Sequence, residues 1–200
     1  VSEWNCHWYH YEYQSGCFQT WPSYNLKYGY LEASIKNPYG VGLWPAFWLF
    51  GEDPTLAQGD YEEIDVYEIN AGRLEGCLTA YGYIGTTHNQ NHILTGLPPY
   101  GVNYQQDYCH DNIGVALVND YTNYHKYALE WTPDKIIWYI DDNIVRITPN
   151  IGLDHYEKII FNIAKSYYTP MATNIALPAK MYIDYLRVYK PINDCGTNIN

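Results

Sequence analysis

The residues best suited to chemistry are four carboxylates crowded into one short segment. They are Glu62, Glu63, Asp65 and Glu68. Like charges held this close together resist joint ionisation, so a purely structural segment has little reason to contain them. A calcium site and an acidic strand facing solvent are the two competing interpretations. Calcium favours ligands from a flexible loop, whereas apolar residues are interleaved with these acids as in a packed strand, which favours catalysis.

The spacing of the acids predicts a local irregularity in that strand. Side chains alternate between faces, so Glu63 and Asp65 share one face, whereas Glu68, five positions beyond Glu63, would point to the other. A β-bulge at Val66 and Tyr67 would insert one residue and return Glu68 to the face of the other two acids. We therefore expect Glu63, Asp65 and Glu68 on one surface.

Paired carboxyl groups on one surface are suited to hydrolysing glycosidic bonds, which requires one ionised and one protonated carboxyl. A separation of roughly 5–5.5 Å between them gives a covalent intermediate and retention, whereas a wider gap admits water and gives inversion. Glu63 and Glu68 would lie roughly 13 Å apart along the bulged backbone, so their side chains would have to lean together. Asp65, between them, would hydrogen-bond the nucleophile.

Strand-like runs separated by turn residues must position these acids. The predicted strands cover residues 28–36, 43–50, 61–70, 77–85, 124–131, 135–141, 144–148, 156–164 and 180–189. The run 43–50 is almost wholly apolar, as expected for a strand buried on both faces, and residues 87–120 are expected to be mainly loops. Many short strands predict an all-β sandwich. Two hundred residues suffice for one domain, residues 1–200, with a substantial core.

Composition excludes several classes of function. A net charge of −11 argues against a nucleic-acid partner, and no apolar stretch is long enough to span a membrane. The 24 tyrosines and seven tryptophans suit a β core and also a surface that stacks on sugar rings. Five cysteines without a CxxC pair lack zinc spacing; we interpret them as small buried apolar residues, and a disulfide pair with leftover thiols is the alternative. No signal peptide is recognised at the start, which looks processed or trimmed.

The acidic segment and its surroundings resemble one known family. Glu63-Ile64-Asp65-Val66-Tyr67-Glu68 resembles the E-[IL]-D-x-x-E signature of glycoside hydrolase family 16, the laminarinase, agarase and carrageenase group. Residues 28–36 resemble its "YGxFEARIK" strand, and residues 42–49 match "GLWPAFWL". Residues 124–133 are similar to "FHxYAxEWTP", and residues 182–189 to the terminal "VDYVRVY" strand. The resemblance covers roughly residues 12 to 190.

This resemblance implies a β-jelly-roll sandwich with an open cleft on its concave face, and hydrolysis with retention. Glu63 would be the nucleophile, Asp65 its assistant and Glu68 the acid/base. Trp44 and Trp48 lie four apart on one strand face, which is either a sugar-stacking surface or a core face, and proximity to Glu63 in the family favours the former. The remaining candidates are Asn162, which either binds sugar hydroxyls or serves strand pairing or a turn, His88 near the leaving group, and Asp184 as a structural calcium ligand.

The sequence departs from the family in three places. Only a dozen residues precede the motif at residues 13–16, so the early strands are expected to be short or missing. Ser34 replaces the arginine of "FEARIK". The family's "NLAVGG" reads Asn162-Ile163-Ala164-Lys165-Ser166, which alters one cleft wall.

We therefore expect an endo-acting hydrolase of a β-linked polysaccharide that needs no cofactor. A laminarin-like β-1,3-glucan is the leading substrate, and agar, porphyran, carrageenan or mucin-type galactans are alternatives. A non-catalytic carbohydrate-binding jelly roll is the competing class, but such a protein does not need both Glu63 and Glu68. A polysaccharide substrate predicts a secreted, periplasmic or cell-surface protein, which we expect to be monomeric.

Overall fold

The computed structural model describes residues 12–51, 62–71, 80–89, 122–150, 152–166, 171, 173 and 175–191. Within them the chain forms ten strands and no helix. One five-stranded antiparallel sheet has the order β1-β9-β3-β4-β5, and the other has the order β10-β2-β6-β7-β8. The strands are β1 (Gly16–Gln19), β2 (Gly29–Lys36), β3 (Leu43–Gly51), β4 (Glu62–Ala71), β5 (Ala80–Asn89), β6 (Tyr124–Trp131), β7 (Lys135–Ile140), β8 (Asn143–Pro149), β9 (Lys158–Lys165) and β10 (Tyr182–Tyr189).

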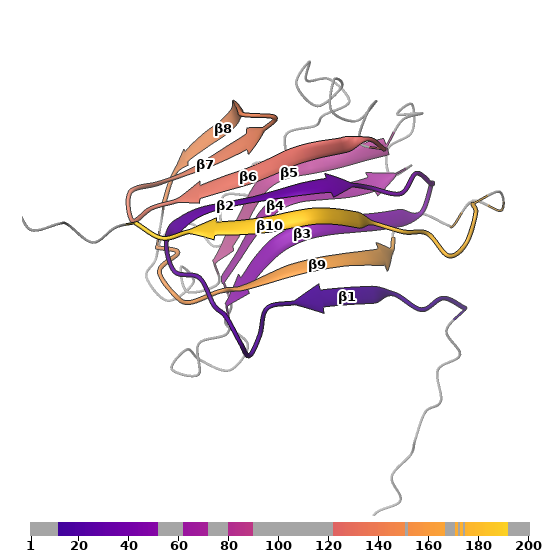
Figure 1. Cartoon of the computed structure of the whole chain (residues 1–200), viewed down its shortest axis with the longest axis horizontal. Coiled ribbons are helices and arrows are strands. Elements are labelled where there is room, and N and C mark those ends of the chain that lie inside the picture. The colour runs from indigo at the N-terminus through magenta and orange to yellow at the C-terminus, as the bar shows by residue number, and fades with distance from the viewer. Residues whose placement is uncertain are drawn as a thin grey trace, which may run out of the picture.

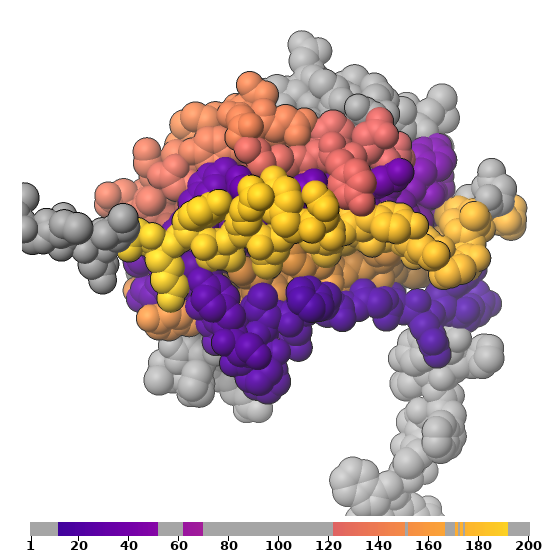
Figure 2. All heavy atoms as spheres, viewed as in Figure 1, coloured from indigo at the N-terminus to yellow at the C-terminus, as the bar shows by residue number. Residues whose placement is uncertain are grey.

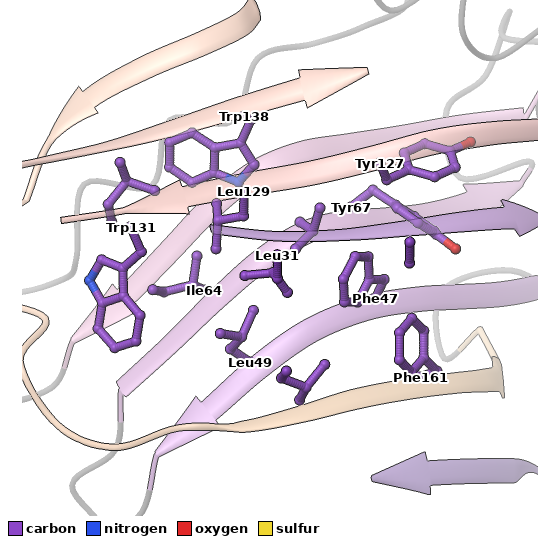
Figure 3. Close-up of a cluster of buried hydrophobic side chains, with 14 of the residues drawn as sticks. Leu31, Phe47, Leu49, Ile64, Tyr67, Tyr127, Leu129, Trp131, Trp138 and Phe161 are labelled. Carbon is purple, nitrogen blue, oxygen red and sulfur yellow. The ribbon is translucent and has the colours of Figure 1, made fainter. Parts of the chain in front are cut away.

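The two sheets stack face to face and enclose one core (Figure 1). The first sheet contributes Phe47, Ile64, Tyr67 and Phe161, and the ring of Phe47 stacks on that of Phe161 at 4.5 Å. Leu31, Leu129, Trp131 and Trp138 of the second sheet meet them from the other side (Figure 3). The core thus lies under the inner face of β4, on the side opposite its catalytic candidates, and the prediction of an all-β sandwich is confirmed.

Most predicted strands are present, with three differences. β1 was not predicted, because its four residues carry no hydrophobic alternation. β5 ends at Asn89 rather than near residue 85, so Thr87 and His88 belong to a strand. β7 ends at Ile140 rather than at residue 141, and β8 begins at Asn143 rather than at residue 144. The turn between them is made by Asp141 and Asp142, which both have positive φ, as a two-residue hairpin with a type I′ turn requires.

The prediction that the apolar run of β3 is buried on both faces was wrong. Burial alternates instead, because Trp44, Trp48 and Phe50 are half-exposed while Phe47 and Leu49 are fully buried. One face of β3 is therefore a partly open aromatic surface rather than a second core face.

The sheet edges carry exposed side chains. All four residues of β1 are exposed, including the free Cys17, so the expectation of a buried cysteine fails there. β10, drawn in yellow, lies on the surface of the molecule (Figure 2), and its residues Tyr182 and Tyr189 are exposed. In the described part of the chain no helix has the length and apolar character to cross a membrane.

The core assignment predicts a contrast between two isoleucines of the second sheet. Ile35→Ala should lower the free energy of unfolding by about 2–5 kcal/mol, because Ile35 is fully buried, whereas Ile147→Ala should change it by about 0.5 kcal/mol or less, because Ile147 is 58% exposed. Urea denaturation of both variants checks this. Equal losses would place Ile35 outside the core.

Candidate active site

Cross-strand pairing places three acids on one face of the first sheet. On β3, Ala46, Trp48 and Phe50 follow each other at intervals of two, and they lie opposite Glu68, Asp65 and Glu63 of β4, respectively. The interval on β4 is three residues between Glu68 and Asp65, since Val66 is the extra residue of a bulge. Directly opposed residues share a face of the sheet. The predicted bulge is confirmed, and we call the surface that carries Glu63, Asp65 and Glu68 the carboxylate face.

The three acids differ in their exposure. Asp65 is only 1% exposed, whereas Glu63 and Glu68 are half-buried. The indole Nε1 of Trp44 donates a hydrogen bond to Oε1 of Glu68 at 3.0 Å. Trp44 was predicted as a sugar-stacking platform, and this contact gives it a second role, because it fixes the direction in which the Glu68 carboxyl points.

An aromatic and amide row extends the carboxylate face across β3 and β9. Trp48 donates from Nε1 to Oδ1 of Asn162 at 2.7 Å, so the structure brings two predicted sugar-binding residues together. The Trp48 ring meets the Phe50 ring edge-on at 5.7 Å, and the Lys158 ammonium lies 5.0 Å from the centre of the Phe50 ring. Phe50 and Lys158 were not predicted as site residues. The alternation of β3 could have indicated Phe50, whereas Lys158 required the register of β9.

Glu62 precedes the candidate nucleophile and anchors the start of β4. Its buried carboxylate accepts hydrogen bonds from the backbone N–H groups of Asp154 and His155 at 3.0 and 3.1 Å and pairs with Nδ1 of His155 at 2.7 Å. These three side chains are the one group of potential metal ligands within 4.8 Å of one another in the described ranges. Because Glu62 already receives three hydrogen bonds, we interpret the group as an anchor for the strand end that carries Glu63.

A second buried acid lies beside this anchor. Glu157 is fully buried, and neither of its carboxyl oxygens has a hydrogen-bond partner among the described residues. A Cβ added to Gly51 would lie 3.1 Å from Cγ of Glu157 and 3.9 Å from Cβ of Glu62, so the two acids flank a glycine. Burial, and then the charges of Glu62, Glu63 and Asp65, raise the pKa of Glu157 well above its ordinary value.

Two predicted site residues are placed only in part. His88 pairs with Glu63 across β4 and β5, so its register position is next to the candidate nucleophile, and its role stays a prediction. Asp184 is exposed at a bulge of β10, and no group of three His, Cys, Asp or Glu side chains in the described ranges includes it. Calcium at Asp184 stays a prediction.

One hollow formed by described residues lies away from these acids. It has a volume of about 500 Å³ and lies between the start of β1, the end of β9, Met171 and residues 177–179, and none of the three acids lines it. This hollow is therefore no part of the carboxylate face.

The burial of Glu157 predicts a pH-dependent stability. In the folded state it keeps its proton above the ordinary pKa of 4.5, whereas the unfolded chain releases it, so its burial lowers stability progressively as the pH rises above about 4.5. Glu157→Gln removes this titration. The free energy of unfolding of the variant minus that of the parent protein should therefore increase as the pH rises. The increase should be up to about 1.4 kcal/mol per pH unit, until the raised pKa is reached.

Urea denaturation of both proteins between pH 4.5 and 8 measures this difference. The exposed Glu12 supplies the control, since Glu12→Gln removes an acid outside the core. The contradicting result is a difference in free energy of unfolding between Glu157→Gln and the parent protein that stays constant with pH. Glu157 would then ionise in the folded protein as it does in the unfolded chain.

Comparison with known proteins agrees with this arrangement. The family model described as glycosyl hydrolases family 16 matches residues 5–187. Glucan endo-1,3-β-glucosidase A1 of Niallia circulans is 34% identical over 90% of this chain and 26% of its own length. The β-glucanase of Rhodothermus marinus is 28% identical over 90% of this chain and 63% of its own length.

Among solved structures, the endo-β-1,3-glucanase of Pyrococcus furiosus is 26% identical, with a TM-score of 0.62 over 87% of this chain and 65% of that one. The chain thus spans less than two thirds of each of these relatives. The match along most of the chain and the shared two-sheet architecture agree with the resemblance of its motifs, and the chain belongs to glycosyl hydrolase family 16.

Proposed function

We propose that this chain is a retaining endo-glycosidase that hydrolyses internal β-linkages of a polysaccharide. The observation that carries the proposal is the bulge of β4, which aligns Glu63, Asp65 and Glu68 on one half-exposed face. Two carboxyls that approach one glycosidic bond from this face supply the nucleophile and the proton that double displacement requires. The reaction needs no further cofactor.

In the first step the carboxylate of Glu63 attacks the anomeric carbon. The bond from that carbon to the leaving oxygen breaks, and Glu68 transfers its proton to this oxygen, so that the leaving sugar departs as an alcohol. A covalent glycosyl–Glu63 ester and an ionised Glu68 remain. The indole N–H of Trp44 already lies against Oε1 of Glu68, which supports the orientation of this carboxyl toward the leaving oxygen.

In the second step Glu68 acts as a base. It removes a proton from a water molecule, and the resulting hydroxide equivalent attacks the anomeric carbon and displaces Glu63. Both acids return to their starting protonation states, and two inversions leave the β configuration unchanged. Asp65 lies in the row between Glu63 and Glu68, where it can hydrogen-bond the nucleophile and hold its charge.

A polysaccharide substrate fits the half-exposed aromatic surface beside the acids. Trp48 and Phe50 are half-exposed aromatic residues, a type that stacks on sugar C–H groups, and Trp48 fixes the half-buried Asn162, whose amide suits hydroxyl groups. The glucanase relatives make β-1,3-glucan the leading substrate. Because such polymers are met outside the cell, an extracellular or periplasmic location belongs to this proposal.

One observation favours the galactan alternative for the choice of sugar. Lys158 places a cation on the carboxylate face, directly across β3 from Glu63, where a sulfate or carboxylate on the sugar would find a partner. A neutral glucan does not need this charge, although Lys158 can also hydrogen-bond a hydroxyl group. The same bond-cleaving residues serve both substrates.

A panel of neutral and anionic polysaccharides tests the proposal. We expect short oligosaccharides from laminarin, and lower or no release from lichenan, agarose, porphyran, κ-carrageenan and mucin glycans. Glu63→Ser should reduce turnover by about 10⁴-fold or more, because the nucleophile is lost, while the urea midpoint stays nearly unchanged.

The outcomes separate the alternatives. Release from an anionic galactan alone would replace glucan as the substrate and leave the catalytic assignment intact. Binding without products on every member would favour the non-catalytic binding protein. Full activity of Glu63→Ser would exclude Glu63 as the nucleophile.

A further inference from the structure

One hydrogen bond crosses the core and ends at the bulge of the catalytic strand. The indole Nε1 of Trp138, on β7 of the second sheet, donates to the backbone carbonyl oxygen of Asp65 at 2.8 Å. Asp65 is the residue immediately before the extra residue Val66. A bulge disrupts the regular ladder of its strand locally, so an additional donor at this point holds the backbone where the ladder holds it least.

Trp138 is itself held firmly in place. Its ring is fully buried in the core (Figure 3). The guanidinium carbon of Arg146 lies 5.0 Å from the ring centre. The register between β7 and β8 also shifts between Trp138 and Tyr139. The indole N–H therefore connects an irregularity of the second sheet to the bulge of the first sheet.

A second tryptophan provides a natural comparison. Trp131 on the neighbouring β6 is also fully buried in the same core, but its Nε1 has no hydrogen-bond partner within the described part of the chain. Trp131 and Trp138 thus share residue type, burial and layer, and they differ in what the indole N–H contacts.

We infer that Trp138 is a positioning residue for catalysis, whose indole N–H fixes the bulge and so sets where Glu68 stands relative to Glu63. This inference rests on the proposed function. Retention requires the two carboxyls to lie about 5–5.5 Å apart, and a misplacement of 1 Å can cost about 100-fold in rate. Loss of the bond displaces the Glu68 end of the strand, because Glu63 lies on the other side of the bulge, next to the Glu62 anchor.

Trp138→Phe and Trp131→Phe test the inference as a matched pair. Both remove the same atoms from the same core, but only Trp138→Phe leaves the Asp65 carbonyl without its donor, so Trp138→Phe should lower the urea midpoint more than Trp131→Phe does. On the polysaccharide, kcat of Trp138→Phe should fall about 10- to 100-fold with KM changed less than about threefold, whereas kcat of Trp131→Phe stays within about twofold of the parent value.

A second, activated substrate distinguishes a positioning role of Trp138 from general destabilisation of the fold. An aryl β-glycoside of a product oligosaccharide, with a dinitrophenol leaving group, needs little protonation by Glu68. The value of kcat/KM, which reports the first step alone, should therefore fall about tenfold less in Trp138→Phe on this substrate than on the polysaccharide. Equal losses on both substrates, or equal losses in the two tryptophan variants, would overturn the inference.

Hydrogen exchange keeps the inference testable apart from activity. The amides of Val66 and Tyr67 should exchange faster in Trp138→Phe than in Trp131→Phe, because only the former loses the bond to the bulge. A parent protein that cleaves neither substrate would contradict the proposed function and leave this comparison intact. Unchanged exchange at the bulge would contradict the role of Trp138.

Discussion

The extra residue in β4 is the constraint on which the rest of the site depends. A regular strand cannot present Glu63 and Glu68 on one face, because five positions separate them. The single residue Val66 corrects the count, and β3 on one side continues its two-residue alternation without interruption. Without this irregularity Glu68 would point into a core of aromatic and aliphatic side chains, where an unpaired carboxylate is costly.

The core beneath the bulge is built to support it. Tyr67, the residue after Val66, is 1% exposed, donates its hydroxyl to Oδ1 of Asn37 at 2.9 Å and packs on Tyr127 at a ring distance of 4.4 Å. Burial raises the pKa of Tyr67 well above its ordinary value, so the phenol remains a donor. Contacts from the second sheet thus fix both sides of the bulge, and the packing of the two sheets stabilises one irregular strand.

The features that could be predicted from the sequence are those that depend on neighbouring residues in the chain. The bulge was predicted from the spacing of three acids along an alternating strand, and most strands were predicted from hydrophobic alternation and turn residues, because these signals are local. β1 and the end of β5 were missed, because their residues show no hydrophobic alternation and belong to strands only through pairing with β9 and β4.

The contacts that set side-chain roles were beyond sequence patterns. The bond from Trp44 to Glu68 links residues 24 positions apart, and the bond from Trp138 to Asp65 links residues 73 positions apart. Nothing in the pattern around Glu157 indicated a buried acid, since its burial depends on Gly51 leaving space for it. Register and packing decide these features.

The anomeric configuration of azide products tests the central claim, that Glu63 is the nucleophile and Glu68 the acid/base, most directly. Glu63→Ala and Glu68→Ala would each be given an activated aryl β-glycoside with sodium azide, and the products read by NMR. Azide that enters the space left by Glu63 attacks from the face opposite the leaving group, so Glu63→Ala should give the α-glycosyl azide. Azide that replaces water on the glycosyl–Glu63 ester should give the β-glycosyl azide from Glu68→Ala. The reverse pair of products, or hydrolysis at the parent rate by either variant, would contradict the account.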